Sequence, residues 1–363
     1  PDTMRTVLVV ASLVLASGCL SRVEEAGAGA SANEADKSGA LDACDVVGPA
    51  FSCASCQAAG HDVDVASLDV AALPELPVAA ADGARTLLFS DSPETPARSG
   101  ILFQADVGPG PARVYVYNVN GTSIRKKITV VVDNLDDAPL TMSIERYAVA
   151  TPSTSYAVEG QQVARDFLTA HDAATKSVAA RGRGLLLVQH LDGVAVGPNE
   201  LQHAIVDVTF DRRARVRVVM LDATTDTLAH VDDVAVLARD AHTRGTFAVA
   251  DRTLSSSCAF DGAVRVPLGA AVLEGVDELT GEAARLAGEY GLVTTIELAT
   301  PARLVLVPRG GFYAGTTVVD GDAIETSGAS VERGASLGAG SDVVWTGPGG
   351  SSLPLALLLL PPS

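Results

Sequence analysis

The chain has 363 residues, a formal net charge of −18 at neutral pH, 47% hydrophobic residues and only 4% aromatic residues. A phosphate backbone repels so acidic a chain, and no basic stripe with interleaved aromatic side chains occurs in it. We therefore expect no nucleic-acid partner. The length suffices for two ordinary domains or one large β domain.

The segment "RTVLVVASLVLASGC", residues 5–19, has the pattern of an export signal. A cationic residue precedes a short apolar run, and small residues follow it. The run is too short for a membrane-spanning helix, which needs about 20 residues. The ending "LASGC" resembles the bacterial lipobox, although Ala16 stands where leucine is usual. This resemblance implies a signal peptide at 1–18 and a lipid on Cys19, and an ordinary secretory signal is the alternative.

A lipid on Cys19 would anchor the protein to a membrane of the bacterial cell envelope, at the outer membrane or the cell surface. Residues 19–43 continue with "SRVEEAGAGASANEADKSGA", which has one valine and no aromatic residue. Such a segment cannot bury enough apolar surface to offset the loss of chain entropy. We therefore expect a lipidated flexible tether at 19–43.

Four further cysteines follow, and an even number in an exported chain indicates disulfide bonds. They are Cys44, Cys53, Cys56 and Cys258. Three pairings are possible, and a bond from the cluster to distant Cys258 would stabilise most because it closes the longest loop. The alternative is a metal site of Cys44, Cys53, Cys56 and His61, a ligand set that suits zinc. Residues 44–83 form a separate cysteine-containing segment on either interpretation.

From residue 84 onward, short apolar runs alternate with turn residues, which is typical of antiparallel β structure. Apolar residues recur at helical spacing only across 159–180, so one helix is predicted there. The fold is therefore predicted to be mainly β, an antiparallel β-sandwich or jelly roll. We divide it into a first β-sandwich region at 84–158 and, at 159–363, a helix followed by a second β-rich region. The runs taken as strands include "GILFQADV", "ARVYVYNVN", "KKITVVVDNL", "PLTMSIERYAV", "GLLLVQHL", "HAIVDVTF" and "ARVRVVML".

The segment 288–315 is predicted to supply two central strands of the C-terminal half. Thr300-Pro301 would form the turn between them. The second strand is apolar on both faces around Leu306, so it should be covered on both sides. Gly310-Gly311 would then allow a sharp turn where a side chain would clash. The closing "LPLALLLLPPS" is too short to span a membrane and is predicted to be a buried last strand.

Seven blocks, in order, resemble those of a family of uncharacterised exported bacterial proteins. They are "FSDSPE", "GILFQADV", "RVYVYNVNGT", "HTRGTF", "GEYGLVTTIEL", "LVPRGGFYAG" and "GPGGSSLPLALLLLP". Relatives in that family often carry a copper-amine-oxidase-like N-terminal repeat, which is absent here. The resemblance implies a secreted, surface-associated, β-rich protein of unknown activity. Copper amine oxidases build their cofactor from a tyrosine that follows asparagine, and no Asn-Tyr pair occurs. We therefore expect no quinone, and no other cofactor.

No catalytic motif stands out. None of the six histidines lies in a His-Glu-x-x-His pattern, and neither a Gly-x-Ser-x-Gly elbow nor a Walker loop occurs. His190 and His203 bracket a loop that could bring both rings to a metal with Asp192 or Glu200. The alternative is that these are unrelated polar residues at strand ends.

Two function classes remain open. The first is a binding or structural module at the envelope, whose partner is an envelope glycan or a protein. A flat face with exposed aromatic side chains would support it, the candidates being Tyr115, Tyr117, Tyr147 and Trp345. The second is a carboxylate-dependent hydrolase acting on envelope or extracellular polysaccharide. Its candidate carboxylates are Asp106, Asp207 and Asp211. We favour binding.

Overall fold

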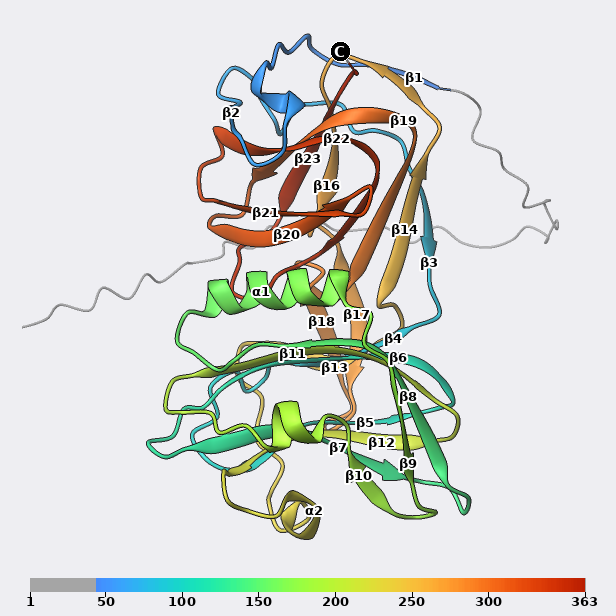
Figure 1. Ribbon diagram of the computed structural model, residues 1–363, viewed down its shortest axis with the longest axis vertical. Coiled ribbons are helices and arrows are strands. Elements are labelled where there is room, and N and C mark those ends of the chain that lie inside the picture. Colours follow the sequence, from blue (N-terminus) through green and yellow to red (C-terminus); the bar gives the residue numbers. More distant parts are fainter. Residues whose placement is uncertain (1–43, 363) are drawn as a thin grey trace, which may run out of the picture. The chain divides into compact units, whose positions relative to one another are not determined.

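The computed structural model describes residues 44–362, and this part of the chain is mainly β (Figure 1). The expected signal peptide at 1–18, Cys19 and the tether at 19–43 lie outside the described residues. No helix in the described part is long and apolar enough to cross a membrane. The predicted fold class is confirmed, since stacked and mostly antiparallel sheets surround the apolar cores.

Two sheets pack face to face as a sandwich at the bottom of Figure 1. Their inward side chains form one apolar core, to which most of the strands contribute alternate residues. The eight-stranded sheet has the order β18 (Glu282–Ala287), β17 (Val272–Asp277), β13 (Arg244–Phe247), β4 (Thr86–Ser90), β6 (Gly110–Val119), β11 (Leu201–Phe210), β8 (Leu140–Val149) and β9 (Ala174–Val178). The four-stranded sheet has the order β10 (Arg183–Leu185), β7 (Lys126–Asn134), β12 (Ala214–Asp222) and β5 (Gly100–Val107).

A nine-stranded sheet forms the upper part of Figure 1 and closes around a second apolar core. Its main path is β16 (Val264–Leu268), β23 (Leu355–Leu360), β19 (Val293–Pro308), β22 (Arg333–Thr346), β20 (Tyr313–Val319) and β21 (Asp322–Gly328). Off this path lie β14 (Asp251–Ser256), β3 (Ala79–Asp82) and β2 (Asp62–Asp64). A small parallel pair completes the fold, namely β1 (Asp45–Val47) and β15 (Ala259–Asp261).

One full helix, α1 (Tyr156–Thr169), packs on both the eight-stranded sheet and β20. Val163 and Phe167, four residues apart, are fully buried on its inner face. The helix is shorter than the expected 159–180, because Ala174–Val178 pairs with β8 as β9. The remaining helical pieces are the four-residue α2 (Thr227–His230), a 3-10 turn (Ser55–Gln57) and a π-helical turn (Val188–Asp192). The last of these replaces the second half of the strand expected in "GLLLVQHL".

The division at 158/159 does not separate the sheets. Strand β11, which follows the helix, pairs with β6 and β8, which precede it. Strand β12 likewise pairs with β5 and β7. Residues 84–158 therefore complete their sandwich only with strands from later in the chain.

The second part of β19, around Leu306, is buried on both faces, as its sequence predicts. Leu304 and Leu306 enter the core of the nine-stranded sheet, whereas Val305 and Val307 face a separate apolar cluster. The expected turn at Thr300-Pro301 is wrong: β19 continues through it, and only the register with β22 shifts between Glu297 and Ala302. The last strand, β23, is fully buried, as predicted.

The cysteine-containing segment covers the outer face of β19. Cys53, Cys56, Val63 and Val65 join Val305 in one buried cluster. Cys44 is disulfide-bonded to Cys258, and Cys53 to Cys56. Of the three pairings that the sequence left open, the structure thus has one that includes a long-range bond to Cys258.

The two disulfides should contribute unequally to stability. The Cys44–Cys258 bond joins residues 214 apart, and Cys53–Cys56 joins residues 3 apart. Each bond lowers the chain entropy of the unfolded state. On this basis the first bond contributes about 5 kcal/mol to the free energy of unfolding and the second about 2 kcal/mol. We expect the paired serine variant Cys44→Ser/Cys258→Ser to lose clearly more free energy of unfolding than Cys53→Ser/Cys56→Ser in denaturant titrations. Equal losses would contradict this.

Leu306→Asp should unfold the protein. Leu306 is 1% exposed within the core of the nine-stranded sheet, and an unpaired carboxylate there costs several kcal/mol, comparable with a domain's margin of about 5–15 kcal/mol. Arg309→Ala, three residues along on a partly exposed turn, is the control and should be mild. Thermal melting measures the effect of both substitutions. A Leu306→Asp variant that melts within a few degrees of wild type would refute the assignment of Leu306 to the core.

Candidate functional site

A pocket of about 250 Å³ lies beside the central strands of the eight-stranded sheet. It extends from an exposed rim at His242 to the buried rings of Phe89 and Tyr115. Four aromatic rings and two carboxyl groups line it together. The lining residues are Phe89, Asp91, Glu94, Tyr115, Tyr117, His242, Tyr290, Gly349, Gly350 and Ser351.

The acidic edge of the pocket follows β4. Phe89 lies in that strand, and the chain then turns through residues 91–94. The Asp240 carboxylate holds this turn, because Ser92 Oγ and the Glu94 N–H both donate to it at 2.9 Å. Asn118 on β6 donates to the Pro93 carbonyl from the other side. Asp91 and Glu94 are therefore held in place by the fold.

The aromatic wall comes from β6, whose side chains alternate between two cores. Val114 and Val116 point into the sandwich, whereas Tyr115 and Tyr117 point to the opposite face, beside α1. Phe89 stacks on Tyr115 with ring centroids 4.5 Å apart. Both faces of β6 are thus covered, and the two tyrosine rings lie in the apolar cluster that also contains residues of α1.

The loop before β23 closes the pocket, and only glycine fits there. A Cβ at Gly349 would lie 2.5 Å from the Tyr117 ring. Gly350 has a φ of +72° and packs against the first turn of α1. Tyr290 completes the wall and donates its hydroxyl to the Ser351 carbonyl at 2.7 Å.

Asp91 is the chemically unusual group in this pocket. Its Oδ1 is buried and has no hydrogen-bond donor among the described residues. Burial, together with the nearby acids Glu94 and Asp240, raises the pKa of the Asp91 carboxyl to about 9. Glu94 instead lies 3.0 Å from Nε2 of His242, whose Nδ1 is 3.1 Å from Asp240. The pocket thus combines a neutral carboxylic acid with a paired carboxylate.

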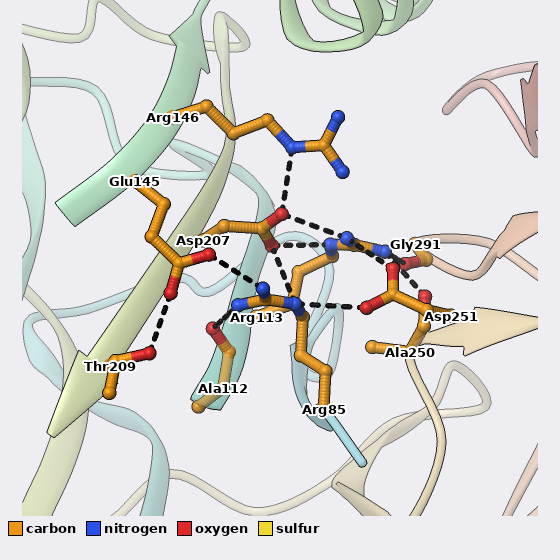
Figure 2. Close-up of polar contacts among 10 residues, drawn as sticks. All are labelled: Arg85, Ala112, Arg113, Glu145, Arg146, Asp207, Thr209, Ala250, Asp251 and Gly291. Atoms are coloured by element: carbon orange, nitrogen blue, oxygen red, sulfur yellow. Dashed lines mark hydrogen bonds and ion pairs between the residues drawn. The ribbon is translucent and has the colours of Figure 1, made fainter. Parts of the chain in front are cut away.

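A second polar cluster is centred on the buried Arg113–Asp207 pair (Figure 2). It lies beside the aromatic wall, because Arg113 precedes Tyr115 by two residues on the same face of β6. Asp207 on β11 is 1% exposed, and three arginines surround its carboxylate. Arg113 donates to both carboxylate oxygens at 2.7 and 2.9 Å, and Arg146 donates at 2.8 Å. Burial alone would raise the pKa of Asp207, but Arg113, Arg146 and Arg85 lower it below its ordinary value.

Arg113 also connects this cluster to the pocket. Its guanidinium donates to the backbone carbonyls of Ala250 and Gly291 and pairs with Asp251 at 2.7 Å (Figure 2). Gly291 directly follows Tyr290, so the hydrogen bond from Arg113 to its carbonyl fixes the backbone that presents this pocket residue. The Asp207 carboxylate already pairs with the guanidinium groups of Arg113, Arg146 and Arg85. The cluster therefore serves as structural support.

The three carboxylates expected for a hydrolase are not placed for catalysis together. Asp207 is the buried partner of the arginines. Asp106 is more than a third exposed and pairs with Arg215 at 2.6 Å. Asp211 is exposed and accepts the Thr141 N–H at 2.7 Å. Each has its own separate partner.

The expected histidine pair does not form a metal site. His203 is buried between the rings of Tyr115 and Tyr117, its Nδ1 lies 2.9 Å from the Val116 carbonyl, and burial lowers its pKa to about 4. His190 contacts Tyr147 at 3.2 Å. The other proposed ligands, Asp192 and Glu200, bind Lys127 and the Gly197 N–H, respectively.

Metal ligation by Cys44, Cys53, Cys56 and His61 is not formed either. The three cysteines are in disulfides, and no group of three or more potential ligands occurs in the part of the chain that the structure describes.

The expected flat aromatic face is also absent among the four candidates. Tyr115 and Tyr117 are buried and line the pocket, Trp345 is fully buried and donates to Tyr313, and Tyr147 is half-buried beside His190. The aromatic residues therefore form a concave site in place of a flat one.

Sequence reasoning missed Asp91, Glu94, His242 and Tyr290. The sequence did contain a signal for this site, namely the blocks that resemble those of the exported family. Four of these seven blocks supply nine of the ten residues that line the pocket. They are "FSDSPE", "RVYVYNVNGT", "GEYGLVTTIEL" and "GPGGSSLPLALLLLP". A fifth block, "HTRGTF", supplies the tenth, His242. Taken one by one, none of the blocks carries a catalytic or binding motif.

No family model and no curated protein matches the chain. Two solved structures align weakly. A mutant of Bacillus subtilis oxalate decarboxylase OxdC has 11% identity over 77% of each chain, with a TM-score of 0.12. A Lactobacillus farciminis oxalate decarboxylase formate complex has 9% identity over 77% of this chain and 86% of its own, also with a TM-score of 0.12. At this TM-score the alignments carry no information on fold or activity.

Removing the charge of Asp207 should be strongly destabilising. Asp207→Asn leaves buried arginines without their shared carboxylate, which costs about 3–5 kcal/mol. Asp106→Asn breaks an exposed arginine pair and is the matched control, expected to cost about 1 kcal/mol or less. Denaturant unfolding measures both, and similar small losses would show that the buried cluster does not support the fold.

Asp91 should make stability depend on pH. Its carboxyl pKa is about 9 in the folded protein against 3.8 for the free side chain, so between these values the folded state holds more protons than the unfolded state. The free energy of unfolding therefore falls as pH rises through this window, by up to about 1.4 kcal/mol per pH unit. Asp91→Asn cannot titrate and should flatten that decline. Identical pH profiles from denaturant titrations would contradict a buried neutral Asp91.

Proposed function

We propose that this protein is a lipid-anchored component of the bacterial cell envelope that binds an envelope glycan in the pocket beside β4 and β6. The observation that carries the binding role is the pocket itself, in which four aromatic rings face the same space as two carboxyl groups. Sugar rings offer both apolar faces and hydroxyl donors, which match aromatic walls and carboxyl acceptors. A volume of about 250 Å³ suits one sugar unit at a chain end.

Anchoring is supported by the lipobox-like "LASGC" alone, which lies outside the described residues. Cys19→Ser should release the protein from membranes into the soluble fraction, because a single anchoring chemistry is removed. Ala16→Leu, which keeps the cysteine and restores the usual residue, should stay in the membrane fraction. Detergent-dependent membrane partitioning of Cys19→Ser would defeat the lipoprotein proposal.

Glycan binding is tested by retention on immobilised cell-wall and exopolysaccharide fractions. Tyr290→Ala removes one pocket wall and should weaken retention at least about tenfold. Tyr147→Ala is the matched control, because this tyrosine is half-buried and lies outside the pocket. Absence of retention by the wild type, or equal retention by both variants, would overturn the proposal.

One observation favours a hydrolase as the second candidate. Asp91 remains protonated at neutral pH and could act as a general acid, with Glu94 as the second carboxylate. Polysaccharide hydrolysis releases reducing ends, which can be measured directly. Activity that disappears in both Asp91→Asn and Glu94→Gln would establish the hydrolase, and its absence from the wild type would eliminate it.

A further inference from the structure

The pocket is lined by acidic side chains without a lysine or an arginine. The acids are Asp91 and Glu94. His242 is the remaining ionisable side chain at the rim, and it already lies between Glu94 and Asp240. An anionic ligand would meet acidic groups without a free cation to pair with. A ligand with a positive charge would be attracted by Glu94, and by Asp91 once that carboxyl group releases its proton.

Asp91 presents an acceptor that lacks a donor. Its Oδ1 is buried at the pocket and receives no hydrogen bond among the described residues. Buried acceptors of this kind are rare in folded proteins because leaving one unpaired is costly. A ligand N–H group in the pocket would satisfy this oxygen, and a charged N–H donor would form the stronger, charge-assisted bond.

The aromatic rings favour the same kind of ligand. Phe89, Tyr115, Tyr117 and Tyr290 surround a small space, and aromatic rings attract organic cations through their π-electron faces. A neutral sugar would also pack on these rings. A cationic ligand would add a charge-assisted hydrogen bond to the acids, which a neutral sugar cannot form.

We propose that the pocket recognises a sugar unit that carries a free amino group, so that the ligand is a glycan with non-acetylated amino sugars. This inference rests on the proposed glycan-binding function and names its ligand class. The ammonium group donates to Asp91 Oδ1, the Asp91 proton passes to solvent, and the aromatic rings hold the sugar ring. The titratable groups that face Asp91 are Glu94, Asp240, His242, Tyr115, Tyr117 and Tyr290.

The test compares two ligands that differ only at the amino group. The purified full chain is titrated calorimetrically, at about pH 6 where the amines are charged, with a β-1,4-linked tetramer of glucosamine and with the matching tetramer of N-acetylglucosamine. We expect the glucosamine tetramer to bind at least about tenfold more tightly. Titrations in two buffers of different ionisation enthalpy should also show proton release on binding.

Two variants test whether Asp91 causes the preference for the glucosamine tetramer. Asp91→Asn keeps the size of the side chain, and Oδ1 of Asp91 makes no hydrogen bond among the described residues that asparagine would break. This variant should fold, lose the preference between the tetramers and release no proton. Asp322→Asn, an exposed acid on β21 outside the pocket, is the matched control and should retain both.

The outcomes separate this inference from the proposed function. Equal affinity for the two tetramers, or a preference that survives in folded Asp91→Asn, overturns the amino-sugar inference and leaves glycan binding standing. Binding of neither tetramer also overturns the inference. Glycan binding is then decided by retention on the envelope polysaccharide fractions.

Discussion

The Asp207 carboxylate and the arginines around it join segments that are far apart in the sequence. Arg113 on β6 and Asp207 on β11 are central in the eight-stranded sheet, and Arg113 also donates to the carbonyls of Ala250 and Gly291. Ala250 precedes β14, and Gly291 precedes β19, so both bonds reach strands of the nine-stranded sheet. A buried ion pair that satisfies several backbone carbonyls thus fixes where the chain crosses between its two sheet systems.

The pocket depends on that arrangement. Tyr290 lies one residue before the carbonyl that Arg113 holds, and Tyr115 and Tyr117 share the face of β6 from which Arg113 extends. The guanidinium of Arg113 also lies 4.9 Å from the Phe167 ring of α1. The Asp207 carboxylate beside the aromatic wall is therefore paired with arginines, whereas Oδ1 of Asp91 in the pocket lacks a donor among the described residues. Asp207 is therefore the structural acid, and Asp91 is the candidate binding acid.

The fold class could be predicted because it depends on local patterns. The apolar run "ARVYVYNVN", taken as a strand, and the two apolar faces around Leu306 are properties of a few neighbouring residues, and the structure confirms both. Predictions failed where long-range pairing overrides local preference. Residues 174–178 continue a helical pattern but pair with β8, and Thr300-Pro301 resembles a turn but lies within β19, held by β22. Pairing with distant strands is not visible in single-sequence patterns.

The candidate site was harder to predict because its residues come from five separate segments. Asp207 seemed a possible catalytic acid from its residue type alone, and only the surrounding arginines show its structural role. Asp91 offered no motif, and its properties follow from burial by strands distant in sequence.

The most direct measurement is a crystal structure of the protein with the glucosamine tetramer at saturating concentration. The account predicts electron density for a terminal sugar among Phe89, Tyr115, Tyr117 and Tyr290, with its amino nitrogen within hydrogen-bond distance of Asp91 Oδ1. Density for the sugar elsewhere on the protein, with this pocket unoccupied, would contradict it.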